Sequence, residues 1–189
     1  MESIRSFIAL DLPESLKKEL ETLLLSLKKC GADVKWVRPA NLHLTLKFLG
    51  DVTPEQLSGV KDRLAAVAER QKPFVLHCVG LGGFPDLERP RVLWVGTDEG
   101  ESELKALARA VESETAGIEF PREQRDFSAH LTLGRVRGGK NLGKLVRNMK
   151  EMAFSSAEKA VMDHLTLYKS TLTPGGSVYD PISVFPFQG

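Results

Sequence analysis

Two short segments of the chain repeat one pattern of side chains that could move protons. His43-Leu44-Thr45-Leu46 and His130-Leu131-Thr132-Leu133 have identical residue types. Alternate side chains of an extended strand point to opposite faces, so each imidazole would share a face with a hydroxyl. An imidazole titrates near neutral pH and can give or take a proton, while a hydroxyl can donate to a phosphate oxygen. The repeated unit is therefore suited to chemistry on a phosphodiester.

Two such units facing each other would supply both proton transfers that phosphodiester cleavage needs. One histidine would remove a proton from the attacking hydroxyl or water, and the other would protonate the departing oxygen. Each transfer is typically worth about two to four orders of magnitude in rate. The hydroxyls of Thr45 and Thr132 would hold the non-bridging oxygens and stabilise developing charge. Because the histidines need opposite protonation states, the pattern predicts a bell-shaped pH profile.

A third copy of the pattern, His164-Leu165-Thr166-Leu167, is surplus to this mechanism. The first two copies each precede a turn and a segment of helical periodicity, whereas the third does not. We therefore interpret His164 as structural or peripheral. His77 lies in a segment of alternating residues and is also most simply structural.

Strand parity makes a prediction for the neighbours of the first motif. On a regular strand, Lys47 would share the face of His43 and Thr45. An aromatic residue such as Trp36 or Phe48 could stack on a base, but parity favours a core position for Phe48. The face predicted to enter the core carries Leu42, Leu44, Leu46 and Phe48.

Helical periodicity of apolar residues appears in four places, within residues 16–27, 57–67, 104–111 and 142–149. The second helix has a clear start, with Thr53 as cap, Pro54 at the first helical position and Gln56 three residues after the cap. Strand-like stretches cover roughly 4–10, 33–37, 42–49, 74–79, 91–96, 129–136 and 161–169. The sequence predicts an α+β chain whose order of elements is roughly duplicated before residue 70 and after residue 74.

The bulk composition excludes several classes of protein. The chain has 189 residues, a formal net charge of +1, 42% hydrophobic residues and 27% charged residues. No apolar run approaches the ~20 residues that cross a bilayer, and the N-terminus has no signal-peptide pattern, so we expect a cytoplasmic protein without membrane contact. The low net charge argues against binding to a DNA duplex. We expect Cys30 and Cys78 to be reduced, and a monomer is the default.

A metal hydrolase and a P-loop enzyme are the weaker alternatives. The four histidines show neither H-x-x-H nor H-x-H spacing, so we expect no bound metal. Residues 134–140 fit G-x-x-x-x-G-K, but Asn141 stands where a Ser or Thr would ligate Mg²⁺. We interpret this segment as a basic turn.

A non-catalytic nucleotide- or RNA-binding module is the more serious alternative. Complete motifs in both halves argue against it, because a binder needs no proton transfer. Basic residues after the second motif could guide an RNA backbone to the site, or could form a solvated helix face. They are Arg135, Arg137, Lys140, Lys144, Arg147 and Lys150, with Arg122 and Arg125 open to the same two interpretations.

With its repeated H-L-T-L motifs, the chain resembles the 2H phosphoesterase superfamily. It resembles more closely the bacterial and archaeal RNA 2′,3′-cyclic phosphodiesterases, also called 2′-5′ RNA ligases. The similarity runs nearly end to end. It includes both H-L-T-L motifs, residues 5–10 (RSFIAL), 36–39 (WVRP), 91–96 (RVLWVG) and 167–170 (LYKS), with Phe84-Pro85, Arg135, Gly176 and Tyr179. The family requires no histidine at the position of His164, in agreement with a structural role.

The resemblance implies a bilobal α+β fold with pseudo-twofold duplication, in which two mainly antiparallel sheets line a central cleft and helices lie outside. Residues 1–189 would form a single domain of two intertwined lobes. The implied activity is metal-independent hydrolysis of 2′,3′-cyclic phosphates to 2′-phosphates without any cofactor, and 2′-5′ ligation would be its reverse. The implied partners are RNA ends, such as those of tRNA, or small cyclic nucleotides. His43 would be the proton donor and His130 the proton acceptor, while Thr45, Thr132 and Arg135 would bind substrate.

Overall fold

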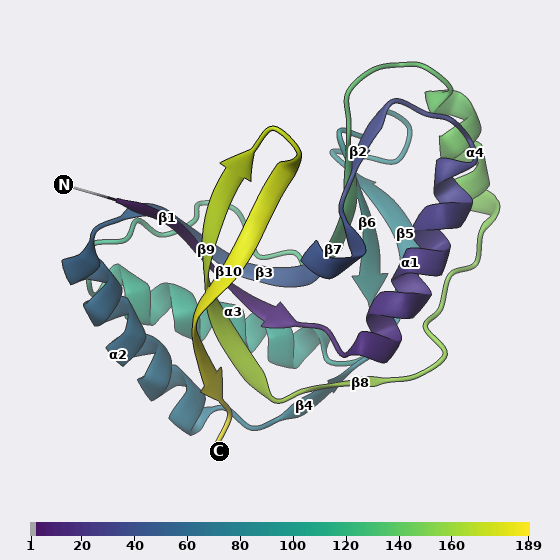
Figure 1. Ribbon diagram of the computed structural model, residues 1–189. Coiled ribbons are helices and arrows are strands. Elements are labelled where there is room, and N and C mark those ends of the chain that lie inside the picture. The colour runs from purple at the N-terminus through teal and green to yellow at the C-terminus, as the bar shows by residue number, and fades with distance from the viewer. Residues whose placement is uncertain (1–2) are drawn as a thin grey trace.

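Two four-stranded antiparallel sheets carry the two motifs, as a computed structural model describing residues 3–189 shows (Figure 1). The first sheet has the order β10-β9-β1-β3, with β1 at Ile4–Asp11, β3 at His43–Val52, β9 at His164–Thr173 and β10 at Gly176–Pro186. The second has the order β2-β7-β6-β5, with β2 at Val34–Trp36, β5 at Cys78–Phe84, β6 at Val92–Thr97 and β7 at Leu131–Val136. A small sheet pairs β4 (Phe74–Leu76) with β8 (Ala160–Met162).

Four α-helices cover the sheets, at the four places that the periodicity predicts. They are α1 (Glu14–Lys28), α2 (Pro54–Arg70), α3 (Glu101–Ala116) and α4 (Leu142–Glu151). The predicted start of α2 is confirmed, since Thr53 and Gln56 form a reciprocal capping box with Pro54 at the first position. A short 3₁₀ helix, η1 (Pro39–Asn41), precedes the first motif strand.

The duplication expected from the sequence is visible in the order and pairing of the elements. The succession β1, α1, β3, α2 in the first half matches β6, α3, β7, α4 in the second. In each half the motif strand pairs antiparallel with the strand that begins the succession, β3 with β1 and β7 with β6. The two motifs therefore occupy equivalent positions in two related sheets.

Elements cross between the two halves. The early strand β2 pairs with β7 in the second sheet, and the late strands β9 and β10 extend the first sheet beside β1. Helix α1 contacts α4, whereas α3 contacts α2 and β3, so each of these helices packs with the other half (Figure 1). One continuous hydrophobic cluster joins the apolar faces of both sheets.

The prediction of about seven strands was too low, since ten strands form within the described residues. The stretches 74–79 and 161–169 are each broken, at His77 and Asp163, where the chain leaves the small sheet for a larger one. Strand β10 was not predicted, because it contains Pro181 and Pro186. It is an edge strand, where the missing N–H of proline is tolerated.

Cys30 and Cys78 are both buried and unpaired in the described chain. Burial raises the pKa of the Cys78 thiol to about 12, so this thiol is inert rather than reactive. Within residues 3–189, no helix combines the length and the apolar character needed to cross a bilayer.

Candidate active site

The two motif strands contact each other across the sheets. Strand β3, which carries His43 and Thr45, contacts β7, which carries Thr132 and follows His130 directly (Figure 1). The two strands belong to different sheets and are separated along the chain by two helices. Tertiary folding therefore brings together the two segments that the sequence pattern selects.

The His43 ring is fixed by contacts on both of its nitrogens. Nδ1 donates to the backbone oxygen of Asn41 at 2.7 Å, and Nε2 lies 2.9 Å from Thr45 Oγ1. Phe7 packs against the ring with centroids 4.9 Å apart, and Tyr179 meets it edge-on at 5.3 Å. Because a carbonyl oxygen can only accept, Nδ1 carries a hydrogen and Nε2 is the nitrogen available for proton exchange.

The pKa of His43 is lowered from its ordinary value, chiefly because burial disfavours the charged ring. The hydrogen bond to Asn41 and the negative charge of Asp11 oppose this effect and raise the pKa. The positive charge of Lys17 on α1 lowers it further. The protonation of His43 therefore depends on a balance between burial and a nearby carboxylate.

His130 is anchored in the same way but has different neighbours. Nδ1 donates to the backbone oxygen of Ser128 at 2.7 Å, and Phe84 meets the ring edge-on with centroids 4.9 Å apart. Burial lowers the pKa of His130, the bond to Ser128 opposes the change, and the positive charge of Arg135 adds to it. Each motif histidine thus donates to the carbonyl two residues before it and leaves Nε2 for chemistry.

A β-bulge interrupts each motif strand at the second leucine of H-L-T-L. In β3, Thr45 pairs with Ala9 and Lys47 pairs with Ile8, which leaves Leu46 without a partner. In β7, Thr132 pairs with Trp94 and Gly134 pairs with Leu93, which leaves Leu133 unpaired. Because a bulge adds one residue to the strand, the side chains that follow it point to the opposite face of the sheet from the one that regular alternation predicts.

The bulge overturns the parity prediction for Lys47 and Phe48. Phe48 pairs with Phe7 on the face of His43 and has 65% of its surface exposed, so it is not a core residue. Lys47 turns to the core side, where it is 6% exposed. Single-sequence parity assumes a regular strand, and the extra residue at Leu46 breaks that assumption.

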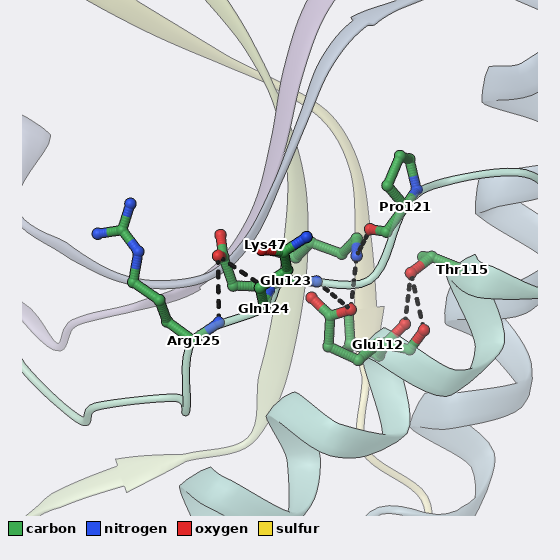
Figure 2. A network of polar contacts seen from close by, with 8 residues as sticks. Lys47, Glu112, Thr115, Pro121, Glu123, Gln124 and Arg125 are labelled. Carbon is green, nitrogen blue, oxygen red and sulfur yellow. Dashed lines mark hydrogen bonds and ion pairs between the residues drawn. The ribbon is translucent and has the colours of Figure 1, made fainter.

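Buried Lys47 connects the first motif strand to the segment that precedes the second motif (Figure 2). Its Nζ donates to Glu112 Oε2 on α3 at 2.7 Å and to the Pro121 carbonyl oxygen at 2.8 Å. The same carboxylate oxygen accepts from the backbone N–H of Glu123 at 3.3 Å. These bonds tie β3 to the loop that leads into His130.

The second bulge brings Arg135 to the face of Thr132. Arg135 pairs with Val92 and Thr132 pairs with Trp94, and the two β6 residues lie two apart on one face. The charge effect of Arg135 on His130 agrees with this placement. Arg135 stands five residues after His130, as Phe48 stands five after His43, so the two occupy equivalent positions.

The third H-L-T-L copy lies in β9, two strands away from β3 in the same sheet. His164, Thr166 and Tyr168 all bond to Asp11 of β1. Sequence reasoning did not select Asp11. Its signal was only an acidic residue at the end of an apolar strand, and the register that places it opposite His43 belongs to the fold.

His77 forms a separate cluster that resembles a Ser-His-Asp triad. Nδ1 lies 2.7 Å from Asp98 Oδ1, and Nε2 lies 3.1 Å from both Ser155 Oγ and the Ser156 carbonyl oxygen. A carbonyl oxygen only accepts, so Nε2 donates and cannot take a proton from the serine. The hydrogen bond that His77 Nδ1 donates to Asp98 raises the pKa of His77, and these contacts fit a structural clamp.

The structure gives no site role to the other candidates from the sequence, which are the P-loop-like segment, Trp36 and the basic residues. Strand β7 is antiparallel to both of its neighbours, unlike the parallel strand of a P-loop. Lys150 is paired with Glu88. Trp36 is half-buried on β2. Among the other basic candidates, six side chains are exposed: Arg122, Arg125, Arg137, Lys140, Lys144 and Arg147.

Comparison with known proteins agrees with the duplicated architecture. The model of LigT-like phosphoesterases matches the chain twice, over residues 10–94 and 95–179. The chain belongs to the LigT-like phosphoesterase family. The first match contains the motif at His43, and the second contains the motif at His130 together with the third copy at His164.

Two relatives illustrate similarity over nearly the whole length of both chains. The protein named RNA 2′,3′-cyclic phosphodiesterase of Archaeoglobus fulgidus is 38% identical over 183 residues, covering 96% of this chain and 99% of the relative. The protein of the same name from Aquifex aeolicus is 35% identical over 200 residues, covering 100% of both chains.

Solved structures share the fold. Escherichia coli LigT in its apo form superposes with a TM-score of 0.80 at 24% identity over 100% of both chains. A Thermus thermophilus protein reaches a TM-score of 0.83, also at 24% identity, over 98% of this chain and 99% of that one. The α+β fold with antiparallel sheets, predicted from the sequence, is confirmed.

Proposed function

We propose that this chain hydrolyses RNA 2′,3′-cyclic phosphodiester ends to 2′-phosphomonoesters by two-histidine acid–base catalysis. One observation carries the proposal: His43 and His130 are anchored identically through Nδ1 and flank two strands that contact each other. Both leave Nε2 for proton exchange. Relatives with this name cover the full chain and support the same activity.

The charges beside the two histidines support opposite roles for them. Burial lowers the pKa of both histidines, but at His43 the carboxylate of Asp11 opposes this lowering and favours the protonated form, as a proton donor needs. The guanidinium of Arg135 lowers the pKa of His130 and favours its neutral form, as a proton acceptor needs. We therefore assign His43 as the acid and His130 as the base.

The reaction then proceeds by one in-line displacement. His130 Nε2 takes a proton from water as the water oxygen bonds to phosphorus. The bond from phosphorus to the 3′ oxygen breaks, and His43 Nε2 gives that oxygen its proton. Thr45 and Thr132 donate to the non-bridging oxygens, whose charge grows in the transition state. The two histidines supply both proton transfers, so no step is assigned to a metal or a cofactor. A 5′-hydroxyl in place of water would attack the same phosphorus, and departure of the 3′ oxygen with the proton of His43 would leave a 2′-5′ linkage.

Substrate contacts follow from the two residues that the bulges bring to the site face. The exposed ring of Phe48 offers a face on which a base can stack. Arg135 can pair with a phosphate of the substrate. Escherichia coli LigT has been crystallised with 3′-AMP, which supports nucleotides and RNA ends as partners.

The same proposal covers the organisation and setting of the protein. Residues 1–189 act as a single domain of two intertwined lobes lining a central cleft, which the exchange of β2, β9 and β10 between sheets supports. The protein works as a monomer in the cytoplasm. Two buried, unpaired cysteines fit a reducing compartment.

Incubating the protein with 2′,3′-cyclic AMP in EDTA tests the proposal. We expect 2′-AMP as the product, identified by ³¹P NMR and chromatography against both phosphate isomers. Binding without turnover would instead support the non-catalytic nucleotide- or RNA-binding module. Activity that survives both His43→Ala and His130→Ala would contradict the two-histidine mechanism.

A further inference from the structure

The carboxylate of Asp11 accepts hydrogen bonds from three side chains of β9, on the face of the sheet that carries His43. Thr166 Oγ1 donates to Asp11 Oδ2 at 2.7 Å, His164 Nε2 donates to the same oxygen at 3.2 Å, and the Tyr168 hydroxyl donates to Oδ1. His164 Nδ1 also faces Asp163 Oδ1 at 2.6 Å. The third H-L-T-L copy thus provides two of the three groups that hold one carboxylate.

Strand register places this carboxylate beside the first motif. Asp11 is the cross-strand partner of His43, and Ala9 is the partner of Thr45 on one side and of Thr166 on the other. Cross-strand partners lie on the same face of an antiparallel sheet. The first and third H-L-T-L copies therefore flank β1 in matching register.

Asp11 keeps its negative charge although it is half-buried. Burial raises its pKa, but the hydrogen bonds from Tyr168, Thr166 and His164 outweigh this effect, and the pKa of Asp11 is lowered. The carboxylate acts on His43 through space, because Nδ1 and Nε2 of that ring already face Asn41 and Thr45. Burial lowers the pKa of His43, and the charge of Asp11 opposes that lowering.

We propose that Asp11 is a positioning residue that favours the protonated form of His43 against the effect of burial, as the role of acid requires, and that His164, Thr166 and Tyr168 hold the Asp11 carboxylate for this purpose. This inference deepens the proposed function and rests on it. The charged groups acting on His43 are Asp11 from β1 and Lys17 from α1, which opposes it, and Tyr179 from β10 is a further titratable side chain that packs against the ring. Removing the Asp11 charge leaves the hydrogen bond to Asn41 to oppose burial and Lys17 without its help, so the pKa of His43 should fall further.

Two measurements on the full chain test this role. The first is an NMR pH titration of the His43 ring, assigned with His43→Gln, in the wild type and in Asp11→Asn. The second is the pH profile of 2′,3′-cyclic AMP hydrolysis. The midpoint of His43 should move to lower pH, and the alkaline limb of kcat should move with it. At pH 8 we expect kcat to fall about three- to tenfold while KM stays within about twofold.

Matched variants separate this role from a merely structural one. Asp163→Asn removes a carboxylate that also bonds to His164 but is 64% exposed and is not the cross-strand partner of His43, so the His43 midpoint should stay in place. Asp11→Glu keeps the charge and should restore part of the alkaline activity. If Asp11→Asn fails to fold, Asp11→Ser removes the charge with a smaller polar group and should shift His43 in the same direction.

The outcomes distinguish this inference from the proposed function. A His43 midpoint that stays unchanged or rises in the folded charge-removing variant overturns the inference, even if the wild type hydrolyses its substrate. A wild type without hydrolysis, in which the midpoint still falls on loss of Asp11, contradicts the proposed function and leaves the coupling of Asp11 to His43 intact.

Discussion

The strands β3 and β7 carry the same H-L-T-L motif at their starts, with His43 as the first residue of β3 and His130 directly before β7, and yet they build two different half-sites. Both anchor their histidine to the carbonyl two residues upstream, and both bulge at the second leucine. Beyond the bulge, β3 continues with Lys47 and Phe48, and β7 with Gly134 and Arg135. The shared residues define the chemical unit, and the residues around them differentiate its two copies.

The difference is largest in the charges near each ring. Asp11, delivered by β1, acts on His43, whereas Arg135, delivered by β7 itself, acts on His130. A duplicated pair of identical histidines cannot divide into an acid and a base without such asymmetry. The neighbours, rather than the motif, therefore supply the division of labour.

Replacing either motif histidine by alanine should have the largest effect on activity and tests whether the two half-sites have different roles. We expect kcat to fall by about two to four orders of magnitude in His43→Ala and in His130→Ala, because each removes one proton transfer. A phosphodiester with a p-nitrophenolate leaving group should rescue His43→Ala alone, since that leaving group needs no proton. Rescue of His130→Ala instead would show that the two roles are reversed.

Truncating Phe48 tests the aromatic side of the comparison. Phe48→Ala should raise KM for 2′,3′-cyclic AMP about five- to a hundredfold, the usual range for losing a stacked base, while kcat changes less. Steady-state kinetics measures this split. Phe48→Tyr, which keeps a ring, is the matched control, and an unchanged KM in the alanine variant would exclude stacking on Phe48.

Neutralising Arg135 tests the charged side. Arg135 lowers the pKa of His130, so Arg135→Gln should raise it. Because a base must be deprotonated, the acid limb of kcat should move to higher pH while the alkaline limb stays in place. Arg137→Gln removes an exposed charge two residues away and serves as the control. A shift of the alkaline limb alone would contradict the assignment of His130 as the base.

Substitutions at the equivalent positions Lys47 and Gly134 should both lower the free energy of unfolding. At Lys47 a buried interaction is lost, whereas at Gly134 an added side-chain atom overpacks the contact. Lys47→Met removes the buried partner of Glu112 and should cost about 1–3 kcal/mol of unfolding free energy. Gly134→Ala would place a Cβ 2.7 Å from Val34 Cγ1 and overpack the β2 contact, at a cost of about 1–3 kcal/mol. Urea unfolding followed by circular dichroism measures both free energies. Lys144→Met, at an exposed position of α4, is the control and should change the free energy of unfolding little.

The exposed basic residues should have the smallest effect. If α4 guides an RNA backbone, Lys144→Ala with Arg147→Ala should weaken binding of an oligonucleotide and reduce the slope of log K against log salt by about 0.7 per lost phosphate contact. Binding of 2′,3′-cyclic AMP should not change. Equal slopes in wild type and variant would leave these residues as a solvated helix face.

The sequence determined the chemical unit and the elements that carry it. Apolar periodicity located α1 to α4, the capping residues fixed the start of α2, and repetition of H-L-T-L located both motif strands. These features are local, because periodicity, capping and alternation act within a few residues of the chain. For the same reason, the third H-L-T-L copy is visible in the sequence, but its position in the sheet beside β1 could not be predicted from it.

Tertiary structure alone decided which side chains face the site. The bulges at Leu46 and Leu133 exist only relative to a partner strand, so no single-strand pattern could predict that Phe48 is exposed and Lys47 buried. Pairing of β1 with both β3 and β9 set Asp11 opposite His43 and gave the third motif a place beside it. Side-chain types come from the chain itself, but register is a property of two segments far apart in it.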